Sequence, residues 1–236
     1  TSLALSIARN AAVDHKETVG FFSLEMADHQ IAMRLLCAES KVDSHLVRTG
    51  NLPKSQWKNL SIHVGTLAEA PIYLDDSPAI TVLELRAKAR RLKAEHDVKM
   101  IIVDYLQLMQ GPKGVESRQQ EISIITRSLK SLAKDLKIPI VALSQLSRAV
   151  ESRTDRRPQL SDLRESGAIE QDADVVMFLY RQWIYSREDQ DRGKAQIIIS
   201  KQRNGPTGTV NVTFIDRFAR FENMSVYETE EAEVPF

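Results

Sequence analysis

Two acidic residues of this sequence each follow an apolar run that is typical of a buried β-strand. Met100–Val103 leads to Asp104, and Val19–Leu24 leads to Glu25. In open α/β sheets, ligands bind at the carboxyl ends of the strands. An acid at such an end can hold a magnesium-bound water, and a second acid nearby can act as a general base. The two strand ends therefore indicate a nucleotide-hydrolysing site, although a turn or helix-capping role would account for either acid alone.

The composition is that of an ordinary globular protein. The chain has 236 residues, of which 42% are hydrophobic and 27% charged, a size that suits one α/β domain with a full core. Its 32 basic residues are balanced by 32 acidic ones. Because the net charge is zero, bulk electrostatics argues neither for nor against nucleic acid, and any binding surface must be local.

The cysteine and histidine pattern excludes a disulfide scaffold and predicts no zinc site. Cys37 is the only cysteine, and its place on an apolar helical face predicts a buried, reduced thiol. The histidines show no spacing typical of metal ligands. No apolar run approaches the roughly 20 residues of a membrane span, and no signal peptide is visible. We therefore expect a cytoplasmic protein that does not contact a membrane.

Apolar periodicity predicts that helices and strands alternate along much of the chain, which implies a mostly parallel central sheet flanked by helices. Thr81 and Glu84 form a capping box that opens one of these helices. The polar segment 43–70 is also expected to be helical. The other helices are expected at residues 2–13, 27–40, 82–97 and 117–136, and the strands at 18–24, 72–74, 99–104 and 138–143.

The second part of the chain has a different pattern. Residues 147–167 lack apolar periodicity and are predicted to form long loops, which are usually functional or mobile in a compact domain. Three further strands, at 174–180, 195–200 and 209–214, are expected to complete the sheet, and the turn signal at 204–208 predicts a C-terminal β-hairpin. We expect residues 1–222 to form one domain and the acidic segment 223–236 to be a flexible tail.

Five short motifs occur in a fixed order, and together they resemble one family. Each is weak alone, but the ordered set resembles the motor domain of DnaB-type replicative DNA helicases, which are RecA-like ATPases. The resemblance covers nearly all of residues 1–222. The motifs are Phe22–Met26, Ile102–Gln107, Leu143–Arg148, Asp162–Gly167 and Lys201–Pro206.

The resemblance implies a fold, an activity and a set of partners. It implies a RecA-like fold and an ATP- and Mg²⁺-dependent motor that translocates 5′-to-3′ on single-stranded DNA and unwinds duplex at the replication fork. It also implies a ring of six identical subunits with ATP sites between neighbours. In the intact protein, a primase and a helicase loader are the further partners that it implies.

The chain departs from the family at its beginning. The family's glycine-rich phosphate loop ends in Gly-Lys-Thr, and here Thr1 matches the threonine whose hydroxyl ligates magnesium, while the glycines and the lysine are absent. We therefore expect a fragment of a larger protein. An intein inserted in the phosphate loop would leave such a break, since splicing requires Ser, Thr or Cys just downstream.

The resemblance assigns roles to individual residues of the ATP site. Asp104 holds the magnesium water together with Thr1, and Glu25 polarises the attacking water. Gln145 senses the γ-phosphate, although a solvent-exposed strand end is the simpler interpretation. Arg203 resembles an arginine finger that reaches the neighbouring subunit, with Lys201 beside it; a solvated hairpin charge is the alternative.

The same resemblance places single-stranded DNA on two loops. Loops 148–157 and 160–168 should line the channel of the ring, and Arg153 and Arg156 contribute to a modest basic excess in the first. In the second loop, Arg164, Glu165 and Gly167 match the segment that grips successive phosphates independently of base sequence. Without the resemblance, both would be ordinary charged surface loops.

Two other functions remain open at this level. The chain could belong to another RecA-like ring or filament ATPase that assembles without processive unwinding, although Lys201–Gly205 disfavours this. Alternatively, without the phosphate loop it could act only as an inactive assembly or binding module. The coding sequence just upstream of Thr1 would separate these functions best: a glycine-rich segment ending in Gly-Lys would indicate the motor, and an intein would explain the break.

Overall fold

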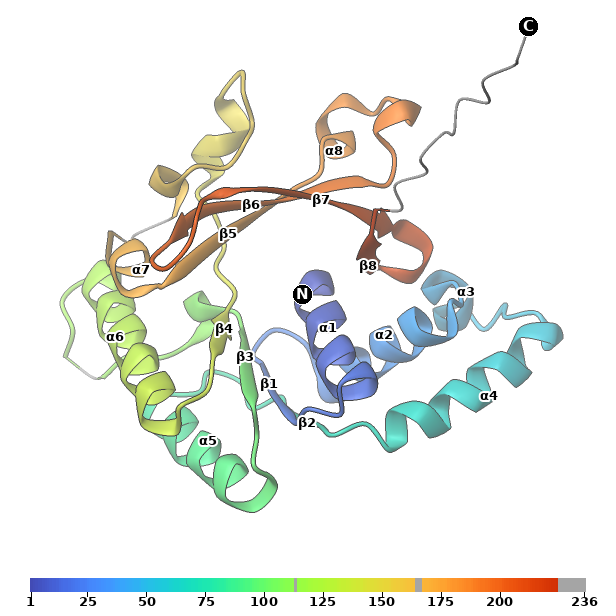
Figure 1. Ribbon diagram of the computed structural model, residues 1–236, viewed down its shortest axis with the longest axis horizontal. Helices are drawn as coiled ribbons and strands as arrows, with labels where there is room; N and C mark the ends of the chain where they lie inside the picture. Colours follow the sequence, from blue (N-terminus) through green and yellow to red (C-terminus); the bar gives the residue numbers. More distant parts are fainter. Residues whose placement is uncertain (113, 164–166, 225–236) are drawn as a thin grey trace, which may run out of the picture.

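The computed structural model describes residues 1–112, 114–163 and 167–224 as two four-stranded sheets with helices packed against them (Figure 1). The strands are β1 Val19–Ser23, β2 Ile72–Asp75, β3 Met100–Asp104, β4 Ile140–Ala142, β5 Val175–Tyr180, β6 Lys194–Gln202, β7 Gly208–Ile215 and β8 Arg220–Asn223. The helices are α1 Ser2–Arg9, which continues as a π-helical turn Asn10–Asp14, α2 Asp28–Ser40, α3 Ser44–Arg48, α4 Lys54–Ala68, α5 Val82–His96, α6 Arg118–Leu136, α7 Gly167–Asp172 and α8 Trp183–Ser186.

The first sheet is parallel, with the strand order β2-β1-β3-β4. Its two interior strands are buried on both faces, because side chains alternate along a strand. Phe22 and Ile101 point into a core with α5 and α6, whereas Phe21 and Ile102 point into a second core with α1 and α2. In Figure 1 these two pairs of helices accordingly lie on opposite sides of the sheet. The parallel sheet and flanking helices of the prediction are confirmed.

Local capping explains where the predicted helices begin and end. The Thr81 hydroxyl accepts a hydrogen bond from the Glu84 amide (3.2 Å), and the Glu84 carboxylate accepts one from the Thr81 amide (2.8 Å), so the predicted capping box is present. The carboxyl ends of α2, α5 and α6 are terminated by left-handed residues, namely Lys41, Asp97 and Lys137. The polar segment 43–70 forms α3 and α4, as expected.

The later strands differ from the prediction, because they do not complete the parallel sheet. They form a separate antiparallel sheet in the order β5-β6-β7-β8. Strands joined by a tight hairpin pair antiparallel, and the turn 203–207 joins β6 to β7 in this way. Along β5 the burial alternates: Val176 and Phe178 are buried, while Met177 is 47% exposed. This one-sided burial is typical of an antiparallel sheet that covers a core with one face only.

Three short elements were not predicted. α7 begins where the long loop was expected to end, α8 follows β5, and β8 pairs with β7. β8 ends at Asn223, and the expected acidic tail lies outside the described residues from position 225 onward. In the described ranges, no helix combines the length and the apolar character that a bilayer span requires.

The antiparallel sheet packs against the α5–α6 core at one end and against α1 at the other. Val176 and Phe178 of β5 belong to the α5–α6 core. Ala195, Val212 and Phe221 form a smaller cluster against Leu3 of α1. Figure 1 shows this sheet arching over the amino-terminal end of α1. The antiparallel sheet therefore contacts helices on both faces of the parallel sheet.

We expect Leu85→Ala on α5 to lower the free energy of unfolding by about 2–5 kcal/mol, because Leu85 is fully buried and its truncation leaves a cavity. Leu83→Ala, on the same helix, is the matched control, since Leu83 is 77% exposed and its loss should cost less than about 0.5 kcal/mol. Urea unfolding measures both variants. Equal losses would contradict the assignment of α5 to the core.

Candidate functional site

The centre of the candidate site is a hydrogen bond between the start of α1 and the end of β3. The Thr1 hydroxyl donates to Oδ2 of Asp104 at 2.6 Å, although the two residues are 103 positions apart. Asp104 is only 3% exposed. Thr1 occupies the N-cap position of α1, where a short hydroxyl side chain is favoured. The predicted pair of magnesium-holding residues is thus brought together by the fold.

The chemistry of this pair fits a magnesium ion. A hydroxyl and a carboxylate are hard oxygen ligands, and Mg²⁺ usually takes only one or two protein ligands and keeps several waters or phosphate oxygens. Within the described ranges, no group of three or more His, Cys, Asp and Glu residues could form an all-protein metal cage. Thr1 and Asp104 are therefore suited to a metal that arrives with other oxygen ligands.

Glu25 lies at the same edge of the sheet. β1 and β3 pair in parallel, with Ser23 opposite Asp104, and the Leu24 amide donates to the Asp104 carbonyl at 2.7 Å. This bond extends the pairing by one residue and places Glu25 directly after it. The Ser23 hydroxyl then donates to the Met26 carbonyl at 2.6 Å and turns the chain toward α2. The Glu25 side chain is exposed, as a group that meets a substrate must be.

Gln145 lies on the next strand end of the same edge. The Leu143 amide donates to the Val103 carbonyl, and the Leu106 amide donates to the Leu143 carbonyl, both at 2.9 Å. These two bonds continue the pairing of β3 with β4 past the end of β4. The exposed Gln145 follows directly, on the strand neighbouring that of Asp104. Three of the predicted ATP-site residues therefore lie at the ends of three adjacent strands, β1, β3 and β4.

Lys201 and Arg203 occupy a different place. Both donate to the carboxyl end of α7: Lys201 bonds the Glu170 carbonyl, and Arg203 bonds the Gln171 carbonyl at 2.6 Å. Nε of Arg203 also lies 3.4 Å from Asp174. Within the part of the chain that the structure describes, neither cation pairs with Glu25 or Asp104. The chain therefore holds these two cations on its own α7.

Asp174 is the acid around which this cluster forms. Lys130 of α6 and Arg203 both reach its carboxylate. The hydrogen bond from Lys130 lowers the pKa of Asp174, and the positive charge of Arg203 acts in the same direction. The Arg203 amide also donates to the Asp174 carbonyl at 2.9 Å, so both the backbone and the side chain of Arg203 are fixed at this point.

The loops predicted to bind DNA are tied to each other. Arg153 makes a two-pronged pair with the buried carboxylate of Asp162, at 2.9 and 2.6 Å. Arg156 is exposed and lies 5.1 Å from the ring centre of Tyr185. Gly167 is the exposed first residue of α7. The guanidinium of Arg153 is thus engaged within the loop, whereas that of Arg156 faces solvent.

The remaining predicted DNA-binding residues, Arg164 and Glu165, lie outside the described residues. The structure does describe the segments on either side of them, Leu160–Asp162 as a 3₁₀ turn and Gly167–Asp172 as α7. The DNA-binding assignment of all five residues stays a prediction.

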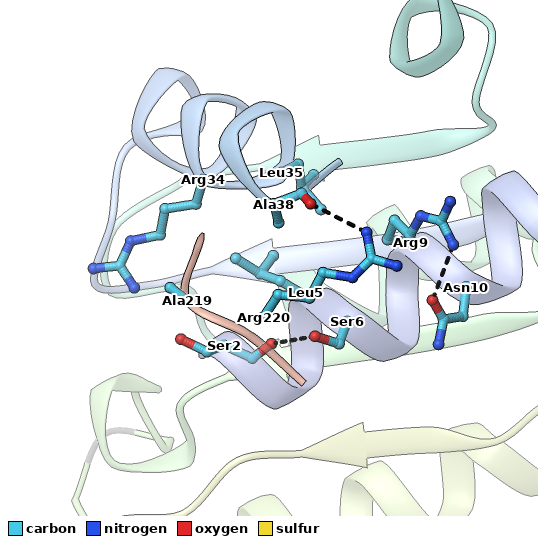
Figure 2. Close-up of a pocket in the computed structure, with 10 residues that line it drawn as sticks. All are labelled: Ser2, Leu5, Ser6, Arg9, Asn10, Arg34, Leu35, Ala38, Ala219 and Arg220. Atoms are coloured by element: carbon cyan, nitrogen blue, oxygen red, sulfur yellow. Dashed lines mark hydrogen bonds between the residues drawn. The ribbon is translucent and has the colours of Figure 1, made fainter. Parts of the chain in front are cut away.

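A second cluster of charged residues, which the sequence analysis missed, attaches α1 to α2 and β8. Because Thr1 is the N-cap of α1, these contacts also help to fix its position. Arg9 of α1 makes a two-pronged pair with Glu39 of α2, at 2.5 and 2.8 Å. Its hydrogen bonds lower the pKa of Glu39. Arg220 of β8 donates to the Ala38 carbonyl at 3.1 Å, as Figure 2 shows, and lies 3.7 Å from Glu39. These contacts span most of the chain, so no local pattern could reveal them.

Arg9 and Arg220 also border a small hollow between α1, α2 and β8 (Figure 2). Ser2, the residue next to Thr1, is one of the residues that line it. The Ser6 hydroxyl accepts a hydrogen bond from the Phe221 amide at 3.2 Å, so β8 is bonded directly to α1. The lining residues are Ser2, Leu5, Ser6, Arg9, Asn10, Arg34, Leu35, Ala38, Ala219 and Arg220.

Comparison with known proteins gives one consistent result. The model of the DnaB-like helicase C-terminal domain matches residues 1–223. The whole chain aligns with 52% of the length of the replicative DNA helicase DnaB of Geobacillus stearothermophilus, with 50% sequence identity. A second alignment covers 95% of this chain and 50% of the replicative DNA helicase DnaC of Bacillus subtilis (strain 168), with 51% sequence identity. The chain thus spans about half the length of these curated relatives.

Solved structures agree with these matches. A structure of a DnaB-like replicative helicase and its interactions with primase superposes on 95% of this chain and 54% of that one, with a TM-score of 0.91 and 37% identity. A second solved structure, of an ATPase domain, superposes on 95% of this chain and 80% of that one, with a TM-score of 0.90 and 36% identity.

We expect Arg153→Met to lower the free energy of unfolding by about 1–3 kcal/mol, because it leaves the buried carboxylate of Asp162 without its charged partner. Arg156→Met is the matched control and should cost less than about 1 kcal/mol, the usual value of an exposed cation–π contact. Chemical denaturation of both variants provides the measurement. An unchanged free energy of unfolding for Arg153→Met would show that the pair with Asp162 does not stabilise the loop.

Proposed function

Because the chain belongs to the DnaB-like helicase C-terminal domain family, we propose that it is the ATP-hydrolysing motor of a replicative DNA helicase. The motor translocates 5′-to-3′ on single-stranded DNA and unwinds the duplex at the replication fork. The observation that carries this proposal is the 2.6 Å bond between the Thr1 hydroxyl and Asp104, at the sheet edge where Glu25 and Gln145 also lie. The names of the curated relatives support it.

Thr1 and Asp104 would hold Mg²⁺, and Mg²⁺-bound ATP supplies the phosphoryl group that is transferred to water. Phosphoryl transfer needs mostly positioning and charge neutralisation, so the residues act by orientation. The Asp104 carboxylate at the end of β3 would hold a magnesium-bound water, and the exposed Glu25 accepts a proton from the attacking water. The side-chain amide of Gln145 donates to the phosphate group that is being cleaved.

Arg203 and Lys201 act on the site of a neighbouring subunit. In one subunit both cations lie on α7 rather than beside Asp104, which supports an action in trans. A guanidinium spreads its charge over several phosphate oxygens, so Arg203 is suited to stabilise the transition state. To do so, it must exchange the Gln171 carbonyl and Asp174 for the neighbour's phosphate. Action in trans requires a head-to-tail interface between subunits. The family supports a homohexameric ring in which each interface completes one site.

Single-stranded DNA passes through the channel of the ring, held by loops 148–157 and 160–168. The Arg164 side chain and the backbone amides of Glu165 and Gly167 grip phosphates, and Arg156 adds an exposed positive charge. Arg153 contributes by holding the first loop in shape through Asp162. Contacts of this kind are independent of base sequence. Primase and a helicase loader bind the assembled ring, and the relatives named as bacterial replicative helicases favour a cytoplasmic location.

An unwinding assay tests the proposed function. In a chain that carries the complete phosphate loop, ATP should drive displacement of a strand from a forked duplex with a free 5′ tail, and not from one with a 3′ tail only. Glu25→Gln should reduce both hydrolysis and unwinding by at least about 100-fold, because the attacking water loses its base. Hydrolysis without unwinding would instead favour another RecA-like ring or filament ATPase.

Subunit mixing tests the trans role of Arg203. Rings of Arg203→Ala and rings of Glu25→Gln should each be nearly inactive, since an arginine finger contributes on the order of 10³-fold or more to the rate. Mixed rings contain interfaces at which the Arg203→Ala subunit supplies Glu25 and the Glu25→Gln subunit supplies Arg203. Hydrolysis should therefore reappear on mixing, as phosphate release will show.

The matched control mixes Arg203→Ala subunits with subunits that carry both substitutions. No interface of that mixture contains both intact groups, so its rate should stay at the background level. If the first mixture is also flat at every ratio, with subunit exchange verified, Arg203 does not act across the interface.

A further inference from the structure

Gln107 bonds the segment that carries the predicted sensor, Gln145. Oε1 of Gln107 accepts a hydrogen bond from the Gln145 amide at 3.2 Å, and Nε2 donates to the Gln145 carbonyl at 3.3 Å and to the Ser144 hydroxyl at 2.9 Å. A carboxamide is both donor and acceptor, so this side chain satisfies both main-chain groups of a single residue. The main chain of Gln145 is thereby fixed to the turn that follows Asp104.

The turn that carries Gln107 is itself held in place. Arg118 of α6 donates to the Gln107 carbonyl at 2.8 Å. The guanidinium of Arg118 also pairs with Glu121, and the Glu121 carboxylate accepts a hydrogen bond from the Gly111 amide at 2.6 Å. Gln107 is therefore part of a supported turn between β3 and α6, and its side chain has a fixed base from which to position Gln145.

The bonds continue from Gln145 toward the segment predicted to bind DNA. Leu146 forms an isolated antiparallel bridge with Leu163, and the Ser147 amide donates to the Asp162 carbonyl at 2.8 Å. The carboxylate of Asp162 is in turn held by Arg153. The two residues after Gln145 are thus bonded to the two residues before position 164. A shift of Gln145 would be transmitted directly to the loop 160–168.

We propose that Gln107 is a positioning residue that couples ATP hydrolysis to DNA binding. It holds the main chain of Gln145 to the strand end of Asp104, so that a change at the phosphate site moves Gln145 and, with it, the bridge from Leu146 to Leu163. This inference rests on the proposed function, because it assigns Gln145 to the γ-phosphate. The side chain of Gln107 touches neither nucleotide nor DNA in this scheme.

The experiment replaces Gln107 with Leu, which keeps most of the volume and removes both hydrogen-bonding groups. Gln110→Leu is the matched control, because Gln110 is exposed and lies three residues further along the same turn. Each variant is made in a chain with the complete phosphate loop. The readouts are the melting temperature and the kcat and KM for ATP, with and without single-stranded DNA.

We expect Gln107→Leu to reduce DNA-stimulated kcat about tenfold, while KM for ATP stays within about twofold of the unsubstituted protein. Gln110→Leu should behave like the unsubstituted protein. Gln107→Glu, which can still accept from the Gln145 amide, should recover part of the loss. In the double variant Gln107→Leu/Gln145→Ala the loss should not exceed that of Gln145→Ala alone, because both substitutions interrupt the same connection.

The outcomes separate this inference from the proposed function. If Gln145→Ala abolishes DNA stimulation but Gln107→Leu does not, the positioning role of Gln107 is refuted and the proposed function stands. Multiplicative losses in the double variant, or a loss in Gln107→Leu that only parallels a lower melting temperature, also refute it. If Gln145→Ala leaves DNA-stimulated hydrolysis unchanged, the role of Gln145 is wrong, and the inference fails with it.

Discussion

The bond between the Thr1 hydroxyl and the buried carboxylate of Asp104 is the contact on which the candidate site depends. Asp104 can lie at the edge of the sheet because Ile101, Ile102 and Val103 are completely buried and anchor β3 between two cores. A buried carboxylate needs hydrogen-bond partners, and the start of α1 supplies one. The bond therefore joins α1, which belongs to one core, to β3, which contributes to both cores. The ends of the neighbouring strands β1 and β4 lie at the same edge of the sheet.

The antiparallel sheet contacts α1, the helix that begins next to Thr1, and it also carries Lys201 and Arg203, the cations proposed to act on a neighbouring subunit. Its β8 end is bonded to α1 and α2 through Phe221 and Arg220. At the opposite end of the sheet, Lys201 of β6 and Arg203 of the following turn bond to α7. A single sheet thus links the element that carries Thr1 to the cations proposed to act on a neighbouring subunit. Any tilt of the sheet relative to α1 would change both ends together.

Two connections link the proposed ATP site to the proposed DNA-binding segment. One is the main-chain route from β4 through Leu146 and Ser147 to Leu163 and Asp162. The other is α7, which begins at Gly167 within the proposed DNA-binding segment and whose last turn carries the carbonyls bonded by Lys201 and Arg203. Both are short and hydrogen-bonded, so they transmit displacement rather than absorb it. The protein needs this stiffness if hydrolysis is to move DNA.

Local patterns in the sequence were sufficient to predict the parallel sheet, its flanking helices and the acids at the carboxyl ends of its strands. Apolar periodicity and capping residues are local signals, and they were sufficient for β1, β3, α5 and α6. The tertiary structure alone decided that β5–β8 form a separate sheet, that Arg153 pairs with Asp162, that Arg203 lies on α7, and that Gln107 holds Gln145. These features depend on contacts between side chains, carbonyls and strands whose proximity is set by packing, and no local pattern in the chain records that proximity.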